Sequence, residues 1–214
     1  DIMWDHGYLD AKQMAGAFQL LRSNDLIWSQ MVQEYLLGKR EPLTDLMAWN
    51  ADSTRMPCRM HSEYLRRLFL DNDLFEGRYQ VDGRPVVLHD IRAPVFVVAT
   101  EKDHVAPWRS VHKIKLALDT DSQFLLASGG HNAGIVSEPG HPGRHFRLSA
   151  CRSEDRYIDP DTWLQTTAPQ NGSWWEAWEE WLGKQSGTLS AVPALGCAQY
   201  PPLEPAPGRY VLER

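Results

Sequence analysis

The chain has 214 residues, 43% of them hydrophobic, which is enough for one well-packed domain with a small appendage. A formal net charge of −6 argues against a nucleic-acid partner, because contacts to phosphates need a basic surface. The longest apolar run, Val95–Ala99, is far too short to span a bilayer, and the acidic N-terminus does not resemble a signal peptide.

Three cysteines, at positions 58, 151 and 197, are an odd number at wide spacings. They predict neither a disulfide framework nor a metal motif, so we expect a reducing cytoplasmic compartment. The first residue is Asp rather than Met, which favours a segment of a longer protein.

The first zone, from about residue 10 to 70, predicts helices. Asn24 and Asp25 can cap a helix over residues 26–37, and Gly38 supplies a typical stop. Another helix is expected after Pro57. Its inward face is predicted to carry four large side chains, Tyr64, Leu65, Leu68 and Phe69.

The middle of the chain predicts a βαβ unit. Residues 94–99 form a β-branched apolar run after a proline, typical of a strand buried on both faces of a parallel sheet. A polar loop (100–107), a helix (111–118), a second strand (123–127) and a Gly-rich loop (128–131) follow. Both loops are expected at the carboxyl edge of the strands, where active sites of open α/β sheets lie.

From Glu138 onward the chain is rich in Pro and Gly, and only a tryptophan-rich segment predicts a helix. Trp174, Trp178 and Trp181 recur at i, i+4 and i+7, which favours an amphipathic helix packed on a core. An aromatic surface for a ligand or an apolar polymer is the alternative. The tail over residues 201–208 is expected to be extended.

Asp103 and His131 end the two loops of the βαβ unit, 28 residues apart. This order suits the acid and base of an α/β-hydrolase triad, in which the carboxylate fixes the histidine tautomer and stabilises the imidazolium. The alternative is a loop cap for Asp103 and a solvated His131. The other histidines lack this context, and His141 and His145 flank a Pro-Gly pair that disfavours a metal site.

A nucleophile is missing from this set. The sequence contains no G-x-S-x-G or G-x-C-x-G elbow, and none of the three cysteines follows a predicted buried strand. The nucleophile is therefore expected upstream of Asp1.

Six motifs resemble those of the polyhydroxyalkanoate synthase family, in its C-terminal half and in the same order. They are Arg22–Trp28, Trp49–Pro57 (W-N-x-D-x-T-x-x-P), Asp103–Trp108 (D-H-V-x-P-W), Gly129–Gly134 (G-G-H-x-A-G), Gly172–Leu182 (G-S-W-W with a later W-L) and Ala206–Val211 (A-P-G-x-Y-V). Asn132 departs from the pattern, since many members have an apolar residue there. This departure leaves open which chain length of monomer is used.

The resemblance implies an α/β fold, namely the C-terminal portion of an α/β-hydrolase fold with a largely helical cap. Residues 1–90 would form the cap, which contributes to dimerisation in this family, and residues 91–214 would complete the core with the tryptophan helix and the tail. The tryptophan helix would then be a packing element.

The implied chemistry is the polymerisation of (R)-3-hydroxyacyl-CoA into a polyester with release of coenzyme A. His131 would be the base for an upstream cysteine, and Asp103 would either orient His131 or help activate the attacking 3-hydroxyl. His104 would contact the substrate or serve the structure. No metal or organic cofactor is implied.

The resemblance also implies a homodimer located in the cytoplasm, at the surface of polyester granules. The chain alone should be inactive, because the cysteine is absent. Two other functions remain as alternatives, a thioesterase or depolymerase on the same fold, and a non-catalytic granule-binding fragment.

Overall fold

A computed structural model describes residues 2–21, 27–39, 45, 55–206 and 208–209. They belong to two units, one made of residues 73–191 and the other of residues 1–72 with 192–214. The predicted cap at Asn24 and Asp25 lies outside the described residues. The predicted division into a cap (residues 1–90) and a core (residues 91–214) stays a prediction.

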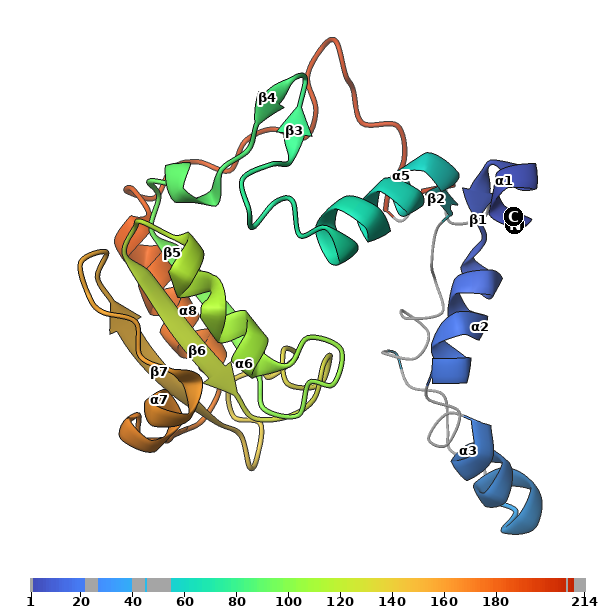
Figure 1. Ribbon diagram of the computed structural model, residues 1–214, viewed down its shortest axis with the longest axis horizontal. Helices are drawn as coiled ribbons and strands as arrows, with labels where there is room; N and C mark the ends of the chain where they lie inside the picture. The colour runs from blue at the N-terminus through green and yellow to red at the C-terminus, as the bar shows by residue number, and fades with distance from the viewer. Residues whose placement is uncertain (1, 22–26, 40–44, 46–54, 207, 210–214) are drawn as a thin grey trace. The chain divides into compact units, whose positions relative to one another are not determined.

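The unit of residues 73–191 is built on a mixed sheet with the strand order β5-β6-β7-β8 (Figure 1). Strands β5 (Val95–Thr100) and β6 (Ser122–Ala127) are parallel, which confirms the predicted βαβ unit. Strand β7 (His145–Cys151) pairs antiparallel with β6, and the short β8 (Gln170–Asn171) pairs antiparallel with β7.

Helices lie against both faces of this sheet, and the side chains of β6 alternate between them. Phe124 and Leu126 pack in one buried cluster with Trp108 and Trp163. These two tryptophans come from α6 (Trp108–Val111), which continues as the 3₁₀ turns of η5 (His112–Ala117), and from α7 (Pro160–Thr166). Leu125 and Ala127 pack on the opposite face with Phe146 and Trp174. The strand period of two thus divides the core between two layers.

The predicted tryptophan helix is α8 (Trp174–Gln185), with Ser173 as its N-cap. Trp174 is buried, and the ring of Trp181 lies 5.4 Å from that of Phe96 on β5. Trp178 is more exposed, with its ring 6.0 Å from that of Trp174. The packing interpretation is therefore confirmed for Trp174 and Trp181, and Trp178 lies at the margin of the buried face.

The Pro- and Gly-rich zone contains more regular structure than its composition predicts. Strand β7 and helix α7 both fall in it, and each has a signal in the sequence. Phe146, Leu148 and Ala150 alternate with more polar residues along β7. Asp159 accepts hydrogen bonds from two N–H groups at the start of α7, where Pro160 takes the first helical position.

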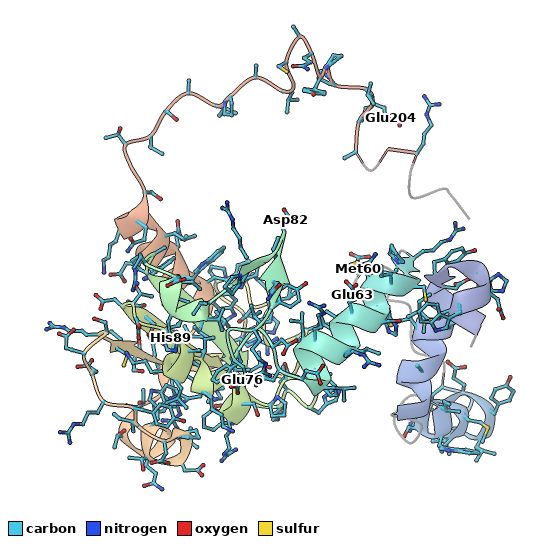
Figure 2. The ribbon with its side chains drawn as sticks, turned by 45° about the horizontal axis from the view of Figure 1, so that its top comes forward. Met60, Glu63, Glu76, Asp82, His89 and Glu204 are labelled. Carbon is cyan, nitrogen blue, oxygen red and sulfur yellow. The ribbon has the colours of Figure 1, made fainter. Side chains whose placement is uncertain are left out.

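A small hairpin precedes the main sheet in the same unit. It consists of β3 (Gln80–Val81) and β4 (Arg84–Pro85), followed by the 3₁₀ turn η4 (Leu88–Asp90). Asp82 (labelled in Figure 2) and Gly83 both have positive φ, as a two-residue hairpin turn of this type requires.

The other unit is mostly helical, as predicted. It contains α1 (Ile2–His6), α2 (Ala11–Leu21), α3 (Ser29–Met31) with the π-helical η2 (Val32–Leu36), α5 (Cys58–Glu63) with the π-helical η3 (Tyr64–Leu70), and the two-stranded pair β1 (Tyr8–Leu9) and β2 (Met56–Pro57). Met60 and Glu63 on α5, and Glu204 in the tail, are labelled in Figure 2. The tail over residues 201–206 has no helix or strand, as expected.

The predicted inward face of the helix after Pro57 is wrong in this structure. Tyr64, Leu65 and Phe69 are exposed, and Leu68 is only half-buried. Among the described residues of this unit, Cys58 is the one buried hydrophobic side chain, so these side chains have no core to pack against. Within the described part of the chain, no helix has both the length and the apolar character that a membrane crossing requires.

Candidate active site

The carboxyl ends of β5 and β6 lie side by side because the two strands are parallel and in register, with Thr100 opposite Ala127. Each strand is followed by a polar loop, which we call the aspartate loop (residues 101–107) and the histidine loop (residues 128–137). Two backbone hydrogen bonds connect the aspartate loop to the end of β6 and to the start of the histidine loop. The Glu101 N–H donates to the Ala127 carbonyl and the Lys102 N–H to the Gly129 carbonyl, each at 2.9 Å.

The aspartate loop holds the Asp103 carboxylate by its own backbone. The N–H groups of Val105 and Ala106 both donate to Asp103 Oδ1, each at 2.8 Å. The loop then enters α6 through Pro107, and the next residue, Trp108, is buried in the core. Trp108 thereby fixes the end of the loop, and Oδ2 of Asp103 is left for another partner.

That partner is His131, whose Nδ1 lies 2.8 Å from Asp103 Oδ2. The carboxylate is only 9% exposed, whereas the imidazole is 45% exposed. An ionised carboxylate can only accept hydrogen bonds, so in the neutral ring Nδ1 is the nitrogen that carries the proton. An imidazole oriented in this way has the geometry that a general base requires.

The electrostatics of Asp103 suit this role. Burial raises the pKa of the carboxyl group, but the hydrogen bonds from the Ala106 N–H, the His131 ring and the Val105 N–H together outweigh it. The net pKa lies below the ordinary value for an aspartate, so the group is ionised at neutral pH and can stabilise an imidazolium beside it.

Glycine shapes the histidine loop. Gly129 has a φ of +107°, a conformation that other residues rarely adopt. Gly134 is buried, and a Cβ added there would lie 2.5 Å from Thr100 Cγ2 and 2.8 Å from the Gly130 carbonyl oxygen. The Gly134 N–H donates to that same carbonyl at 2.8 Å, which closes a tight turn around His131.

Three more histidines pair with carboxylates, which the sequence pattern does not reveal. His89 lies 3.2 Å from Asp119, His141 lies 2.9 Å from Glu138, and His145 lies 3.2 Å from Glu101 of the aspartate loop. These three carboxylate side chains are 28–59% exposed. Asp103 differs in being nearly buried with its second oxygen held by two backbone N–H groups. The His131 pair therefore differs from the other three in the burial and the backbone contacts of its carboxylate.

The other candidates for the site are His104 and the three cysteines. His104, next to the acid, is exposed, and its role stays a prediction. Cys151 lies opposite Ser122, at the end of β6 remote from the histidine loop. Ser122 and Ala127 are five positions apart along the strand, so Cys151 lies about 16 Å from the start of the histidine loop, too far to serve as the nucleophile. The three cysteines of the chain are free thiols.

Among the described residues, no group of three or more His, Cys, Asp and Glu side chains gathers in a way that would hold a metal ion. His141 and His145 each pair with a carboxylate, Glu138 and Glu101. The arrangement that the described residues provide at this edge of the sheet is a hydrogen-bonded pair of a nearly buried carboxylate and a partly exposed imidazole.

Comparison with known proteins gives this pair a chemical context. The chain matches no protein-family model. It is 40% identical over 212 residues to poly(3-hydroxyalkanoate) polymerase 2 of Ectopseudomonas oleovorans, which covers 99% of the chain. Over nearly its whole length the chain is similar to a segment of poly(3-hydroxyalkanoate) polymerases. Identity to the polymerase of Methylorubrum extorquens is 39% over 98% of the chain, and to polymerase subunit PhaC of Cupriavidus necator 36% over 93%.

The match covers nearly all of this chain but only part of each relative. The chain spans 37%, 34% and 33% of the length of these three poly(3-hydroxyalkanoate) polymerases. The predicted resemblance is thereby confirmed for the segment.

Proposed function

We propose that the protein containing this chain is an acyltransferase that polymerises (R)-3-hydroxyacyl-CoA into polyhydroxyalkanoate and releases coenzyme A. One observation carries the proposal. The hydrogen bond from His131 Nδ1 to Asp103 Oδ2 joins the two loops whose motifs resemble those of the polymerase family. The names of the relatives, poly(3-hydroxyalkanoate) polymerases, support the reaction class.

The fold that we propose is the C-terminal portion of an α/β-hydrolase core. Parallel β5 and β6, with the acid after one and the histidine after the other, suit the last two catalytic strands of such a core. The antiparallel β7 and β8 would extend the sheet beyond them. Residues 1–90 would act as a helical cap, in keeping with the helices of that segment.

The first half-reaction would load an acyl group on a cysteine outside these 214 residues. Nε2 of His131 would take the proton of the thiol, and the thiolate would attack the carbonyl carbon of the thioester. The bond to the coenzyme A sulfur would then break, and the imidazolium would return its proton to that sulfur. Asp103 would hold the ring in the required tautomer and stabilise its positive charge.

The second half-reaction would transfer the acyl group to a 3-hydroxyl. That hydroxyl oxygen would attack the cysteine thioester, a new ester bond would form, and the cysteine sulfur would leave with a proton. The imidazole or the Asp103 carboxylate would accept the hydroxyl proton, and both assignments suit the observed geometry. We propose no metal or organic cofactor, since the thioester supplies the driving force.

The remaining assignments follow the same proposal. His104 would contact the substrate beside the acid. The protein would be a homodimer that acts in the cytoplasm at the surface of polyester granules.

The test uses the full-length protein with His131→Ala and Asp103→Asn. Loss of an oriented base reduces turnover by about 100- to 10,000-fold, so coenzyme A release should fall in that range in both variants. His141→Gln is the matched control, because it removes another histidine–carboxylate pair away from Asp103. Near-normal turnover in His131→Ala would refute the assignment.

The same assay separates the proposal from its alternatives. A polymerase should incorporate one hydroxyacyl unit into insoluble polyester for each coenzyme A released, whereas a thioesterase or depolymerase would yield free 3-hydroxy acid. The 214-residue chain alone should release no coenzyme A, and release by the isolated chain would contradict the external nucleophile. Granule binding by a full-length protein without an elbow cysteine would favour a non-catalytic role.

A further inference from the structure

The start of α8 makes a row of hydrogen bonds to the backbone of the histidine loop. The indole N–H of Trp174 donates to the Gly134 carbonyl at 3.1 Å, and that of Trp175 donates to the Ile135 carbonyl at 2.8 Å. The Ser173 hydroxyl donates to the Ser137 carbonyl. Three successive residues of the helix start thus bind three carbonyls just after His131.

Two of these contacts, those made by Ser173 and Trp174, are shielded from water, whereas the Trp175–Ile135 bond is exposed. Ser173, Trp174 and Ser137 are buried, and so is Gly134. The Ser173 hydroxyl also accepts a hydrogen bond from the Trp175 N–H at 3.0 Å, so the cap of the helix and the contact to the loop share one side chain. In a dry environment such bonds are strongly directional, and a donor lost there leaves a carbonyl unsatisfied.

The two members of the acid–base pair are held by different sets of contacts. The aspartate loop holds Asp103 through the N–H groups of Val105 and Ala106. The histidine loop is attached at its start to the Lys102 N–H through the Gly129 carbonyl, and at its end to α8. His131 lies between these two attachments, so the 2.8 Å contact to Asp103 depends on where α8 holds the loop.

We propose that Trp174 and Trp175 are positioning residues for His131. Their indole N–H groups hold the histidine loop so that Nδ1 stays on Asp103 and Nε2 stays accessible. This proposal rests on the proposed function of His131 as a base. It assigns the pair of tryptophans a role that hydrophobic packing alone would not need, because packing requires an aromatic ring but no N–H donor.

Trp174→Phe and Trp175→Phe in the full-length protein test the proposal, since each keeps a large ring and removes the donor. Misplacing a reacting group by about 1 Å costs about 100-fold, so kcat should fall about 10- to 100-fold with little change in KM. The control is Trp178→Phe on the same helix, whose indole makes no hydrogen bond among the described residues. It should keep kcat within about twofold.

A second readout separates positioning from general destabilisation. In protein labelled with ¹⁵N at histidine, the Nδ1–H proton of His131 should give a downfield signal, assigned by its loss in His131→Ala. That signal should weaken or move upfield in the two Phe variants and persist in Trp178→Phe. The pH profile of kcat should shift in the same two variants.

Unchanged kcat and an unchanged Nδ1–H signal in both Phe variants would overturn the inference. So would equal losses in all three variants that follow their melting temperatures. If His131→Ala itself retains turnover, the proposed function fails, and the Nδ1–H signal still decides whether the tryptophans hold the loop.

Discussion

Gly134 is the most crowded of the three glycines in the histidine loop, and its replacement tests how tightly the loop must close. A Cβ at this position would approach Thr100 Cγ2 to 2.5 Å and the Ser128 carbonyl oxygen to 3.0 Å. Backbone must move to relieve such contacts, and His131 would move with it. We expect Gly134→Ala to lower kcat for coenzyme A release by at least about 10-fold in the full-length protein.

Gly130 provides the matched control, since it also lies in the loop and adjoins His131. A Cβ at Gly130 would meet only the Lys102 carbonyl oxygen at 3.9 Å, an ordinary contact distance. Gly130→Ala should therefore stay within about threefold of the wild-type kcat. Equal losses of kcat in the two variants would show that any side chain added to the loop is harmful. The close contacts at Gly134 would then not explain its loss of kcat.

Sequence pattern predicts the meeting of Asp103 and His131 because parallel strands end at a common edge, and each residue follows its strand closely. It does not predict the hydrogen bonds of Trp174 and Trp175. Their acceptors are backbone carbonyls 40 residues away in the sequence. Every residue has such a carbonyl, so the sequence does not indicate which ones accept these hydrogen bonds. The pair of His145 and Glu101 was missed for a related reason, since it depends on where the antiparallel β7 begins.

At the scale of elements, α8 contains a glycine whose replacement should stabilise it. Gly183 lies inside the helix, and a Cβ there would meet no atom within 4 Å. Alanine in a helix interior is favoured over glycine by about 0.5–1 kcal/mol. Gly183→Ala should therefore raise the free energy of opening of the α8 amides by about that amount, as measured by hydrogen exchange.

Gly172, just before the same helix, should respond in the opposite way. Its φ is +112°, a region that alanine rarely adopts, so Gly172→Ala should lower the same opening free energy. The contrast separates helix propensity from a general benefit of removing glycine. Stabilisation by both replacements would contradict the conformational argument.

Elements whose pattern agrees with their environment are the predictable ones. Strands β5 and β6 are apolar runs in a covered sheet, and α8 combines a Ser cap with tryptophans at helical spacing. The sequence does not predict strand β7 because Gly140, Pro142 and Gly143 come directly before it, although Phe146 and Leu148 mark its buried face. The apolar residues of η3 indicated a buried face that the described residues do not cover.

At the scale of the whole unit of residues 73–191, His112 lies where a helix layer packs on the sheet. It comes from η5, and its ring contacts Phe124 of β6 at 4.8 Å and Trp163 of α7 at 5.5 Å between centroids. The side chain is only 7% exposed. Among the described residues its Nδ1 is buried without a hydrogen-bond partner. A histidine held this way is stable only while the three elements stay together and the ring stays neutral.

This burial makes the stability of the unit depend on pH. Burial lowers the pKa of His112, and the Asp159 carboxylate raises it by less, so the net pKa lies below the ordinary value of about 6.5. Above that value the ring is neutral in both the folded and the unfolded state. As the pH falls below about 6.5, the unfolded state takes up a proton that the folded state resists. The stabilisation is therefore full above about pH 6.5 and is lost on acidification, by at most about 1.4 kcal/mol per pH unit for one proton.

Hydrogen exchange of the β6 amides in the full-length protein, corrected for intrinsic exchange rates, measures this loss between pH 8 and pH 5. His112→Phe keeps an aromatic ring among the same neighbours and removes the titration, so it should flatten the decline in opening free energy. His141→Gln should leave the decline in place, because it alters a more exposed pair at the surface. A decline that survives in His112→Phe would assign the acid sensitivity to other groups. A decline that disappears would show that one buried imidazole couples the layers of the sheet to pH.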